Sequence, residues 1–386
     1  MPDISVSDQK TEKNMIKKIC FLIGSYNNGG GTERVTSQIA DGLAERGYDI
    51  SIVSIEKGLQ PHFETDKRIK LYELCRTEKF SSEANSLAKK LKYKLWCLKK
   101  ISAIKKSFKK TIRKILPELV IAVDIECYRI IDPFRKKFHY KTIGWEHFAL
   151  LVRGGRGVDY SRKLAVKHAF KLLVLSDSDL RDYKERYPKA KNLMRIFNPV
   201  AFKPTYNSDM NNKVVIAAGR FAAQKNFDAL IGIWNKISDK CADWELRIYG
   251  DGKDKEKLQS LIEKYGLSNV KLMPYAPRLD EEMDKASIYA LSSIYEGFGL
   301  VLIEAQAKGL PCVSFNCKHG PSEIITDGVN GFLIEPGDTD GFADKLLKLI
   351  NNYELRKSFS DNARKDLYRF DVDFVVDQWV EMLESI

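Results

Sequence analysis

Short apolar runs alternate with amphipathic stretches along almost the whole chain, and this alternation restricts the fold more than any other feature. The first example begins with an apolar run at Lys18–Gly24 and the glycine turn Asn27–Gly31. A helix follows, which we expect Thr32 to cap and Gly47 to end, and then a second apolar run at Asp49–Ile55. Strand, helix and strand in this order form a βαβ unit, which joins parallel strands. The alternation therefore predicts an α/β fold built on parallel sheets.

The same alternation continues to the C-terminus. Further strands are expected at 119–123, 141–144, 172–175, 214–218, 244–249, 270–273, 288–291 and 311–315. Helices are expected at 226–237, 256–265 and 372–386, and from Ser176 or Ser178 onward. A single hydrophobic core rarely grows beyond about 250–300 residues, so a chain of 386 residues is expected to form two domains. The polar stretch Asn207–Asn212 marks the linker.

The predicted fold class is therefore a pair of doubly wound, Rossmann-like α/β domains. We expect them at residues 1–203 and 204–367, with the amphipathic tail at 368–386 packing back onto the first. Ligands of such sheets bind beyond the carboxyl ends of the strands, here in a cleft between the two domains. The residues that follow the strands are therefore the candidates for function.

Two loops that follow strands carry groups suited to a diphosphate. Gly30 and Gly31 precede a helix, so the backbone can approach an anion and the helix N-terminus offers free N–H groups. Gly219 and Arg220 follow another strand, and Lys225 comes five residues after Arg220. Arginine provides a planar fork for phosphate oxygens and lysine a mobile charge. Taken singly, a plain strand-to-helix turn and two solvated loop cations explain these residues equally well.

A third loop adds carboxylates. Phe298, Gly299 and Leu300 precede an apolar helix, so their N–H groups are free to face a phosphate. Glu296 lies in the loop, and Glu304 lies two turns into the helix in the otherwise apolar run 300–307. A buried acid needs hydrogen-bonding partners, and sugar hydroxyls are suitable ones. The alternative is a capped helix with one stray acid, and the apolar surroundings of Glu304 count against it.

At these residues the sequence resembles the retaining glycosyltransferases of family 4, which have the GT-B fold. The segments that carry the resemblance are Glu296-x7-Glu304, Gly219-Arg220-x4-Lys225, the glycine turn at 29–34, and the segments 331–333 and 336–338. The similarity spans the chain from about residue 17 to the tail. The loop His319–Glu323 departs from the commoner Gly-Gly version and is similar to family members that assemble polysaccharides.

The resemblance implies a role for each matched residue. The groups that would hold the donor diphosphate are Arg220, Lys225, Gly219 and the amides of Phe298, Gly299 and Leu300, with Gly30 and Gly31 opposite. Glu304 would bind the ribose, and Glu296 the hydroxyls of the transferred sugar. His147 would contact the donor sugar near the reacting carbon, and Glu146 beside it would face the acceptor or Arg153. The residues near which a uridine base would lie are Met273 and Tyr275.

The sequence predicts a reaction that needs no metal ion. Asp371 and Asp373 form an Asp-x-Asp pattern, but they begin the tail helix far from the nucleotide motifs, so we interpret them as a helix cap. Arg220, Lys225 and a helix N-terminus would instead stabilise the charge on the leaving diphosphate. They would replace the divalent ion that other transferases use, and no cofactor is expected.

The positive charge of the chain is concentrated in one segment. Residues 84–117 contain twelve Lys or Arg and no Asp or Glu, which equals the net charge of +12. Apolar residues recur there every three or four positions from Leu87 to Ile115, with Tyr93 and Trp96 among them. A basic amphipathic helix of this kind suits an anionic membrane surface. A solvated helix that covers the first sheet is the alternative, and nucleic acid is disfavoured because no groove-reading motif accompanies the charge.

Together these features predict a hexosyltransferase of cell-surface polysaccharide assembly, for example of capsule or O-antigen. It would move galactose, glucose or an N-acetylhexosamine from a UDP-sugar to a lipid-linked saccharide acceptor, with retention. No run reaches the roughly 18 apolar residues of a membrane span, and Met1–Lys18 is polar, so we expect a cytoplasmic protein at the inner face of the cell membrane. The alternatives are a UDP-sugar epimerase or phosphorylase on the same fold, and a non-catalytic peripheral membrane protein.

Overall fold

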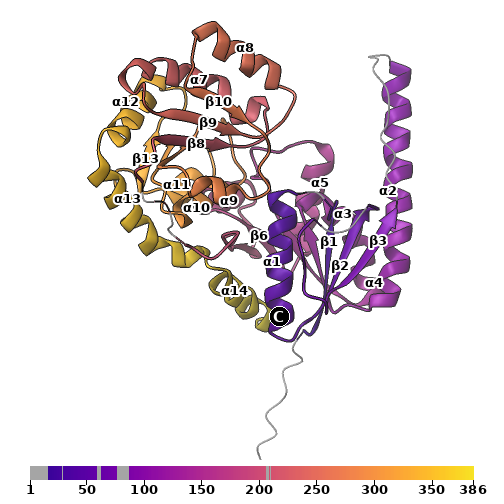
Figure 1. Cartoon of the computed structure of the whole chain (residues 1–386). Helices are drawn as coiled ribbons and strands as arrows, with labels where there is room; N and C mark the ends of the chain where they lie inside the picture. Colours follow the sequence, from indigo (N-terminus) through magenta and orange to yellow (C-terminus); the bar gives the residue numbers. More distant parts are fainter. Residues whose placement is uncertain (1–15, 28, 59–61, 76–86, 206–207, 209) are drawn as a thin grey trace, which may run out of the picture.

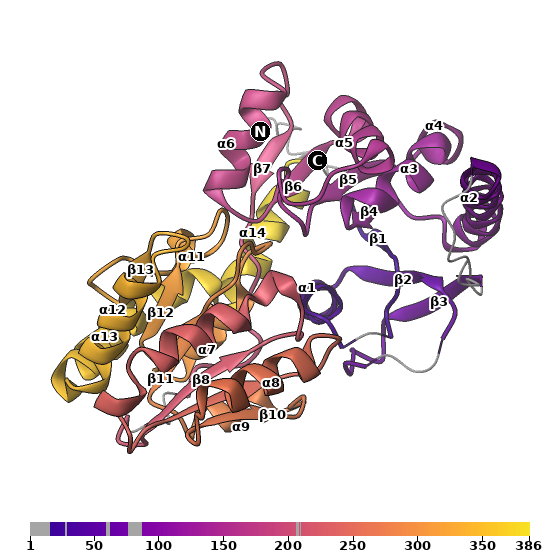
Figure 2. The same ribbon diagram turned by 90° about the horizontal axis from the view of Figure 1, so that it is seen from above.

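The chain forms two parallel sheets with helices around them, as the sequence predicts (Figures 1 and 2). The computed structural model describes residues 16–27, 29–58, 62–75, 87–205, 208 and 210–386, and the side chains of the helix at 87–115 from Trp96 onward. No helix in these ranges combines the length and the apolar character needed to cross a membrane.

The N-terminal domain is built on a seven-stranded sheet in the order β3-β2-β1-β4-β5-β6-β7. Its strands are β1 (Lys18–Ile23), β2 (Asp49–Glu56), β3 (Lys70–Cys75), β4 (Leu119–Val123), β5 (Lys141–Trp145), β6 (Lys171–Val174) and β7 (Leu193–Arg195). Its helices are α1 (Gly31–Glu45), α2 (Leu87–Ile115), α3 (Tyr128–Ile131), α4 (Arg135–Phe138), α5 (Arg156–His168) and α6 (Asp177–Arg186). Successive residues of β1 point to different hydrophobic clusters, Phe21 to one and Leu22 to another. Both faces of the sheet are therefore buried, as in doubly wound folds.

The C-terminal domain repeats the design with six strands in the order β10-β9-β8-β11-β12-β13. The strands are β8 (Val214–Ala218), β9 (Glu245–Tyr249), β10 (Val270–Met273), β11 (Ile288–Leu291), β12 (Cys312–Phe315) and β13 (Gly331–Ile334). The helices are α7 (Phe227–Asn235), α8 (Lys255–Tyr265), α9 (Leu279–Met283), α10 (Leu300–Ala307), α11 (Pro321–Ile324), α12 (Thr339–Ile350) and α13 (Tyr353–Asp366). In each sheet the strand order reverses, at β1/β4 and at β8/β11, and these reversals place the ligand crevice.

The tail returns to the N-terminal domain. The last helix, α14 (Val372–Glu384), packs against α1 (Figure 1). A side chain at Gly42 of α1 would collide with Val376, so this glycine admits the tail helix. The buried Trp379 packs edge-on against Trp145, with ring centroids 4.8 Å apart. Asp371 accepts hydrogen bonds from the backbone N–H groups of residues 373 and 374, which confirms its predicted capping role.

Several local predictions need correction. Gly30, not Thr32, is the N-cap of α1, because Thr32 already lies inside the helix. The strands β3, β7 and β13, the helices α5, α12 and α13, and the short helices α3, α4, α9 and α11 were not among the predicted elements. The predicted linker at 207–212 includes residues 207 and 209, which lie outside the described residues. The boundary that we place between residues 203 and 204 falls in the connection from β7 to β8.

The basic segment forms α2, as predicted, and residues 84–86 at its start lie outside the described residues. Figure 1 shows α2 running along the outer side of β3 and extending past the end of that strand. Ile104, Phe108, Ile112 and Ile115 are buried in a hydrophobic cluster of the N-terminal domain. This part of the apolar stripe therefore covers the sheet and cannot insert into a membrane. Leu98, in the preceding part, is 57% exposed.

Candidate active site

A cavity of about 800 Å³ lies between the two domains. It is lined by residues that follow β1, β5 and β6 in the N-terminal domain and β8, β9, β10 and β11 in the C-terminal domain. The carboxyl ends of both sheets thus meet at one cleft, where the fold class leads us to expect a ligand. The predicted residues on its lining are Gly31, His147, Gly219, Arg220, Lys225, Tyr275, Glu296, Phe298, Gly299, Leu300 and Glu304.

Two predicted donor residues are not on this lining. Gly30 caps α1 between Gly29 and Gly31, both of which reach the cavity. Met273 ends β10 with its side chain half-buried, and Tyr275, Ala276 and Pro277 take the position at the cavity wall. The segment that we predicted to hold the base therefore presents residues 275–277, whereas Met273 packs against the hydrophobic core.

Gly219 makes room for Lys225. The Lys225 side chain crosses over the glycine so closely that a Cβ there would lie 2.7 Å from its Cε. Nζ of Lys225 then reaches Oε1 of Glu296 at 2.7 Å, and Oγ of Ser293 donates to the same oxygen at 2.6 Å. Both partners of this ion pair are mostly buried. Arg220 differs, because its side chain is exposed at the cleft and forms no ion pair with any described residue.

The start of α10 combines a fixed side chain with free backbone groups. The ring of Phe298 is buried and stacks on Phe197 at 5.5 Å, so this residue is anchored in the core. Gly299 follows in the left-handed conformation, with φ of +88°, which glycine adopts without strain. The N–H groups at the first turn of α10 therefore face the cavity, where they can bind an anion.

Glu304 lies one turn further into α10 and is buried. Its Oε1 accepts a hydrogen bond from Nη2 of Arg34, which comes from α1 in the other domain. Burial raises the pKa of Glu304, and the neighbouring guanidinium of Arg34 acts against this rise. Arg34 belongs to the glycine turn that we singled out, but the sequence alone suggested no role for it.

His147 follows β5 and lines the cavity. Its ring packs against Trp145, with centroids 4.4 Å apart. Burial lowers the pKa of His147 to about 3, so the imidazole is neutral near pH 7. Its Nε2 is buried and has no hydrogen-bond partner among the described residues. A neutral imidazole can offer this atom to a ligand as a donor or an acceptor, according to its tautomer.

Glu146 is a structural residue, which corrects our expectation for it. It is fully buried, and its Oε2 accepts hydrogen bonds from Nε of Arg162 at 2.8 Å and from the hydroxyl of Tyr183 at 2.6 Å. It therefore faces neither the acceptor nor Arg153, which pairs with Asp124 and Glu126. This buried network fixes the strand end that carries His147. Its members lie far apart along the chain, so no local pattern indicated it.

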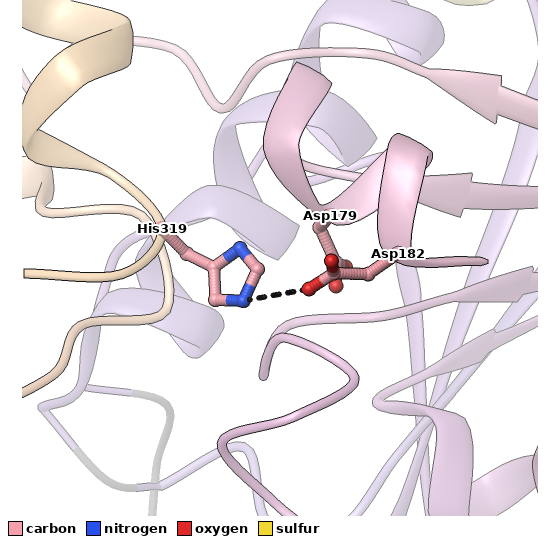
Figure 3. A group of neighbouring side chains, drawn as sticks. All are labelled: Asp179, Asp182 and His319. Atoms are coloured by element: carbon pink, nitrogen blue, oxygen red, sulfur yellow. Dashed lines mark ion pairs between the residues drawn. The ribbon is translucent and has the colours of Figure 1, made fainter. Parts of the chain in front are cut away.

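A polar contact joins the domains beside the cleft. Oγ of Ser178 on α6 lies 3.1 Å from Nδ1 of His319, which is in the loop before α11. Nε2 of the same ring lies 3.3 Å from Asp182 (Figure 3). Asp179, Asp182 and His319 offer ligand atoms within 4.8 Å of one another, the spacing of a candidate metal site. None of the three lines the cavity, so a metal ion there would not contact a donor in the cleft.

Loops that the sequence analysis passed over also build the site. Tyr249, Gly250 and Asp251 follow β9 and line the cavity. A Cβ at Gly250 would lie 2.0 Å from the carbonyl oxygen of Gly219, so the two loops touch through their backbones. The signal for this contact was the pair Gly250 and Gly252 directly after a predicted strand, a position where glycine often marks close backbone approach.

The chain matches known proteins along nearly its whole length. A model of the family "Glycosyl transferases group 1" matches residues 201–366. An uncharacterized glycosyltransferase of Haemophilus influenzae is 31% identical over 95% of this chain and 100% of its own length. The chain therefore belongs to the group 1 glycosyltransferases, and its reaction is glycosyl transfer. The family assignment does not support the epimerase and the non-catalytic alternatives.

Two further proteins are similar at lower identity. The lipopolysaccharide 1,6-galactosyltransferase of Salmonella typhimurium is 26% identical over 86% of this chain and 90% of its own length. The solved structure of Anabaena HepE in complex with UDP and glucose has a TM-score of 0.74 and 20% identity, over 96% of this chain and 100% of that chain. The structural similarity confirms the predicted GT-B fold of two Rossmann-like domains facing across a cleft.

Stability should fall as the pH rises because of Asp179. Burial, with Glu146 and Asp182 nearby, raises the pKa of Asp179 to about 7 from 3.8. The folded state thus holds this proton more tightly than the unfolded state, so the stability present below about pH 4 is lost as the pH rises to about 7. Asp179→Asn keeps an oxygen that can accept from the N–H of Leu150 but cannot ionise. We expect its melting temperature to fall less between pH 5 and pH 8.

Asp177→Asn is the matched control, because Asp177 lies on the same helix with its side chain half exposed. This control should follow the wild-type profile in differential scanning calorimetry. Glu146, whose pKa burial also raises to about 7, titrates in the same window and should leave a residual slope in both variants. An Asp179→Asn profile as steep as that of the wild type would contradict the assignment.

Proposed function

We propose that this glycosyltransferase moves a hexose from a UDP-sugar, with retention, to a lipid-linked saccharide in cell-surface polysaccharide assembly. One observation carries the proposal: Arg220, Lys225 and the N-terminus of α10 converge on one cavity that Glu296 and Glu304 also line. The cations and free N–H groups suit a diphosphate, and the two carboxylates suit the hydroxyls of ribose and hexose. The hexose would be galactose, glucose or an N-acetylhexosamine.

Stabilisation of the leaving group is the main catalytic effect in this proposal. Breaking the bond between sugar and phosphate places negative charge on the diphosphate and positive charge on the sugar carbon. Arg220, Lys225 and the α10 amides would meet the negative charge in positions that the fold already fixes, which is usually the largest contribution to such catalysis. His147 would contact the sugar near the reacting carbon. In this scheme no metal ion or other cofactor takes part.

The donor and the acceptor are inferred from similar proteins and from the family resemblance. UDP and glucose are bound in the HepE structure, and a lipopolysaccharide 1,6-galactosyltransferase is among the relatives. These names support a UDP-hexose as donor and a cell-surface saccharide as acceptor. Retention and the lipid anchor of the acceptor are our inferences from the family 4 resemblance and from the basic helix.

The exposed face of α2 supports contact with an anionic membrane at the inner face of the cell membrane. Lys99, Lys106, Lys110 and Arg113 are exposed on this helix, and Leu98 is exposed near its start. Cations near an anionic bilayer contribute about 1 kcal/mol each. Figure 2 shows α2 at the edge of the N-terminal domain farthest from the C-terminal domain, where a flat surface can approach it. The enzyme would then encounter a lipid-linked acceptor at the membrane surface that α2 contacts.

Arg220→Ala should abolish transfer with the fold intact. The side chain is exposed, so its removal leaves no buried charge unpaired. Loss of one preorganised donor costs on the order of 3–4 kcal/mol of transition-state stabilisation, or about 100- to 1000-fold in kcat. Lys225→Ala should lose as much. The measurement is UDP release from UDP-hexoses, with membrane extract as the source of acceptor.

Arg364→Ala, a partly exposed arginine of α13, is the control and should keep full activity. Circular dichroism should show each variant folded. Near-normal UDP release by both the Arg220 and the Lys225 variants would remove the proposed diphosphate site. A thermal-shift screen over nucleotide-sugars would identify the donor independently of turnover.

A chelator should leave the activity unchanged, because protein cations already stabilise the leaving group in this scheme. The same assay is run after dialysis against excess EDTA, and again after Mg²⁺ or Mn²⁺ is added back. Equal rates are expected in all three samples. Activity that disappears with EDTA and returns with either ion would overturn the metal-free mechanism.

Membrane capture should depend on the lysines of α2. Replacement of Lys99, Lys106 and Lys110 by Gln should weaken binding to anionic vesicles by on the order of 100-fold, at about 1 kcal/mol per cation. Capture should also fall with added salt, because the screening length shortens to about 8 Å at physiological ionic strength. Vesicle sedimentation measures both effects.

The matched control replaces Lys253, Lys255 and Lys264 by Gln, three exposed lysines of the C-terminal domain. It removes the same charge and should leave capture unchanged. Turnover of a water-soluble acceptor should persist in both variants, and turnover of a lipid-anchored acceptor should fall only in the α2 variant. Normal sedimentation of the α2 variant would show that this helix is merely solvated.

A further inference from the structure

Arg34 reaches across the cleft from one domain to the other. It lies in the first turn of α1, lines the cavity, and pairs with Glu304 of α10 through Nη2. Its side chain is 31% exposed, whereas that of Glu304 is 7% exposed. The guanidinium is therefore held at one end and accessible to a ligand in the cavity at the other.

The ion pair uses only part of the guanidinium. An arginine side chain carries five N–H donors in a planar fork. In the described part of the chain, no hydrogen bond is formed by Nε or Nη1 of Arg34, since the Glu304 contact involves Nη2 alone. Nη2 carries two N–H groups and Glu304 takes one of them, so the second can act together with Nε or Nη1 and leave one edge of the fork available for two oxygens, the geometry that suits a phosphate.

Cations and helix N-termini lie close to Arg34 in the cavity. The N-termini of α1 and α10 face each other, so closely that a Cβ at Gly31 would touch Leu300 at 3.0 Å. Each helix N-terminus carries a partial positive charge, and Arg220 and Lys225 line the same cavity. Acidic groups on the lining besides Glu296 and Glu304 are Asp251 and Asp280, and Asp280 is already paired with Arg278. Arg34 and Lys225 are paired with Glu304 and Glu296, so the groups that remain to receive an anion are Arg220, the helix N-termini and the unused N–H groups of Arg34.

We propose that Arg34 is a ligand of the donor diphosphate, supplied by the N-terminal domain. In the free enzyme its guanidinium balances the buried charge of Glu304. When the ribose hydroxyls bind Glu304, the open edge of the fork binds a phosphate oxygen, so Arg34 bridges the ribose site and the diphosphate site. A nucleoside diphosphate then contacts both domains and favours the closed cleft. This inference rests on the proposed function, because it takes Glu304 as the ribose ligand.

A simpler role for Arg34 is to neutralise Glu304 and nothing more. The two roles separate when Glu304 loses its charge, because Glu304→Gln removes the need for a counter-ion and keeps a side-chain oxygen for ribose. Under the simpler role Arg34→Ala has no further effect in that background. Under our proposal Arg34→Ala still removes a phosphate ligand.

The experiment is a double-mutant cycle read out by UDP binding in isothermal titration calorimetry. It compares the wild type, Arg34→Ala, Glu304→Gln and the double variant. A hydrogen bond to a charged group contributes about 1.5–3 kcal/mol, and 1.4 kcal/mol is tenfold in affinity. We therefore expect Arg34→Ala to weaken UDP binding by about 10-fold or more, both alone and in the Glu304→Gln background. Arg34→Lys should fall in between, because it keeps the charge and loses the fork.

Arg46→Ala, at the C-cap of the same helix, is the control. Arg46 pairs with Asp377 of α14, outside the cavity lining, so this variant should bind UDP as the wild type does. Equal UDP affinity of Glu304→Gln and the double variant would overturn the proposal and leave Arg34 as a counter-ion. Tighter binding by Arg34→Ala would also overturn it and make Arg34 a competitor of the donor. A wild type that does not bind UDP would instead overturn the proposed donor, and this inference with it.

Discussion

The structure of the cleft depends on the groups that neutralise the charges of two buried carboxylates. A carboxylate in an apolar setting is unstable unless a cation or several donors face it. Glu296 has Lys225 and Ser293, and Glu304 has Arg34 from the other domain. A feature of the nearby backbone accompanies each of these pairings. Gly219 leaves room for the Lys225 side chain to pass over it, and Arg34 meets Glu304 where the starts of α1 and α10 come close together.

The arrangement of the domains comes from a core that they share. One hydrophobic cluster contains Phe21 of the first sheet, Phe298 at the cleft and Trp379 of the tail helix. Trp379 packs on Trp145, and the ring of Trp145 packs on His147 at the cavity wall. The tail therefore supports a residue of the candidate site through two aromatic contacts. A helix at the very end of the chain is part of the architecture of the cleft.

Two kinds of positive charge serve different surfaces of this molecule. In the cleft, the cations and helix N-termini are few, fixed and partly buried, which suits one small anion. On α2, the lysines are exposed and spread along a helix, which suits a broad anionic surface. The apolar side of the same helix, from Ile104 to Ile115, is buried in the hydrophobic core. Periodicity alone could not separate these uses, because a stripe that covers a sheet and one that enters a bilayer have the same spacing.

The sequence by itself determined the sheets and most of the cleft. Strands buried on both faces form apolar runs in the sequence, so β1, β2, β4, β5 and β6 were predictable, and so were β8, β9, β11 and β12. Arg220, Lys225, Glu296 and Glu304 follow or flank such strands, and the carboxyl ends of parallel strands share one edge, so their convergence was predictable too. The edge strands β3 and β7 are only partly buried, carry a weaker apolar signal and were missed. The edge strand β13 was missed although it is mostly buried, and the edge strand β10 was predicted although it is only partly buried.

Only the tertiary structure decided which charged groups meet. Arg34 and Glu304 are 270 residues apart, and Ser178 and His319 are 141 residues apart. It also decided that Glu146 is buried with Arg162 and Tyr183, although it adjoins a residue of the cavity wall. Local sequence patterns report the burial of an element through its periodicity. The partner of a buried charge is set by the packing of whole domains, which leaves no local periodicity in the sequence.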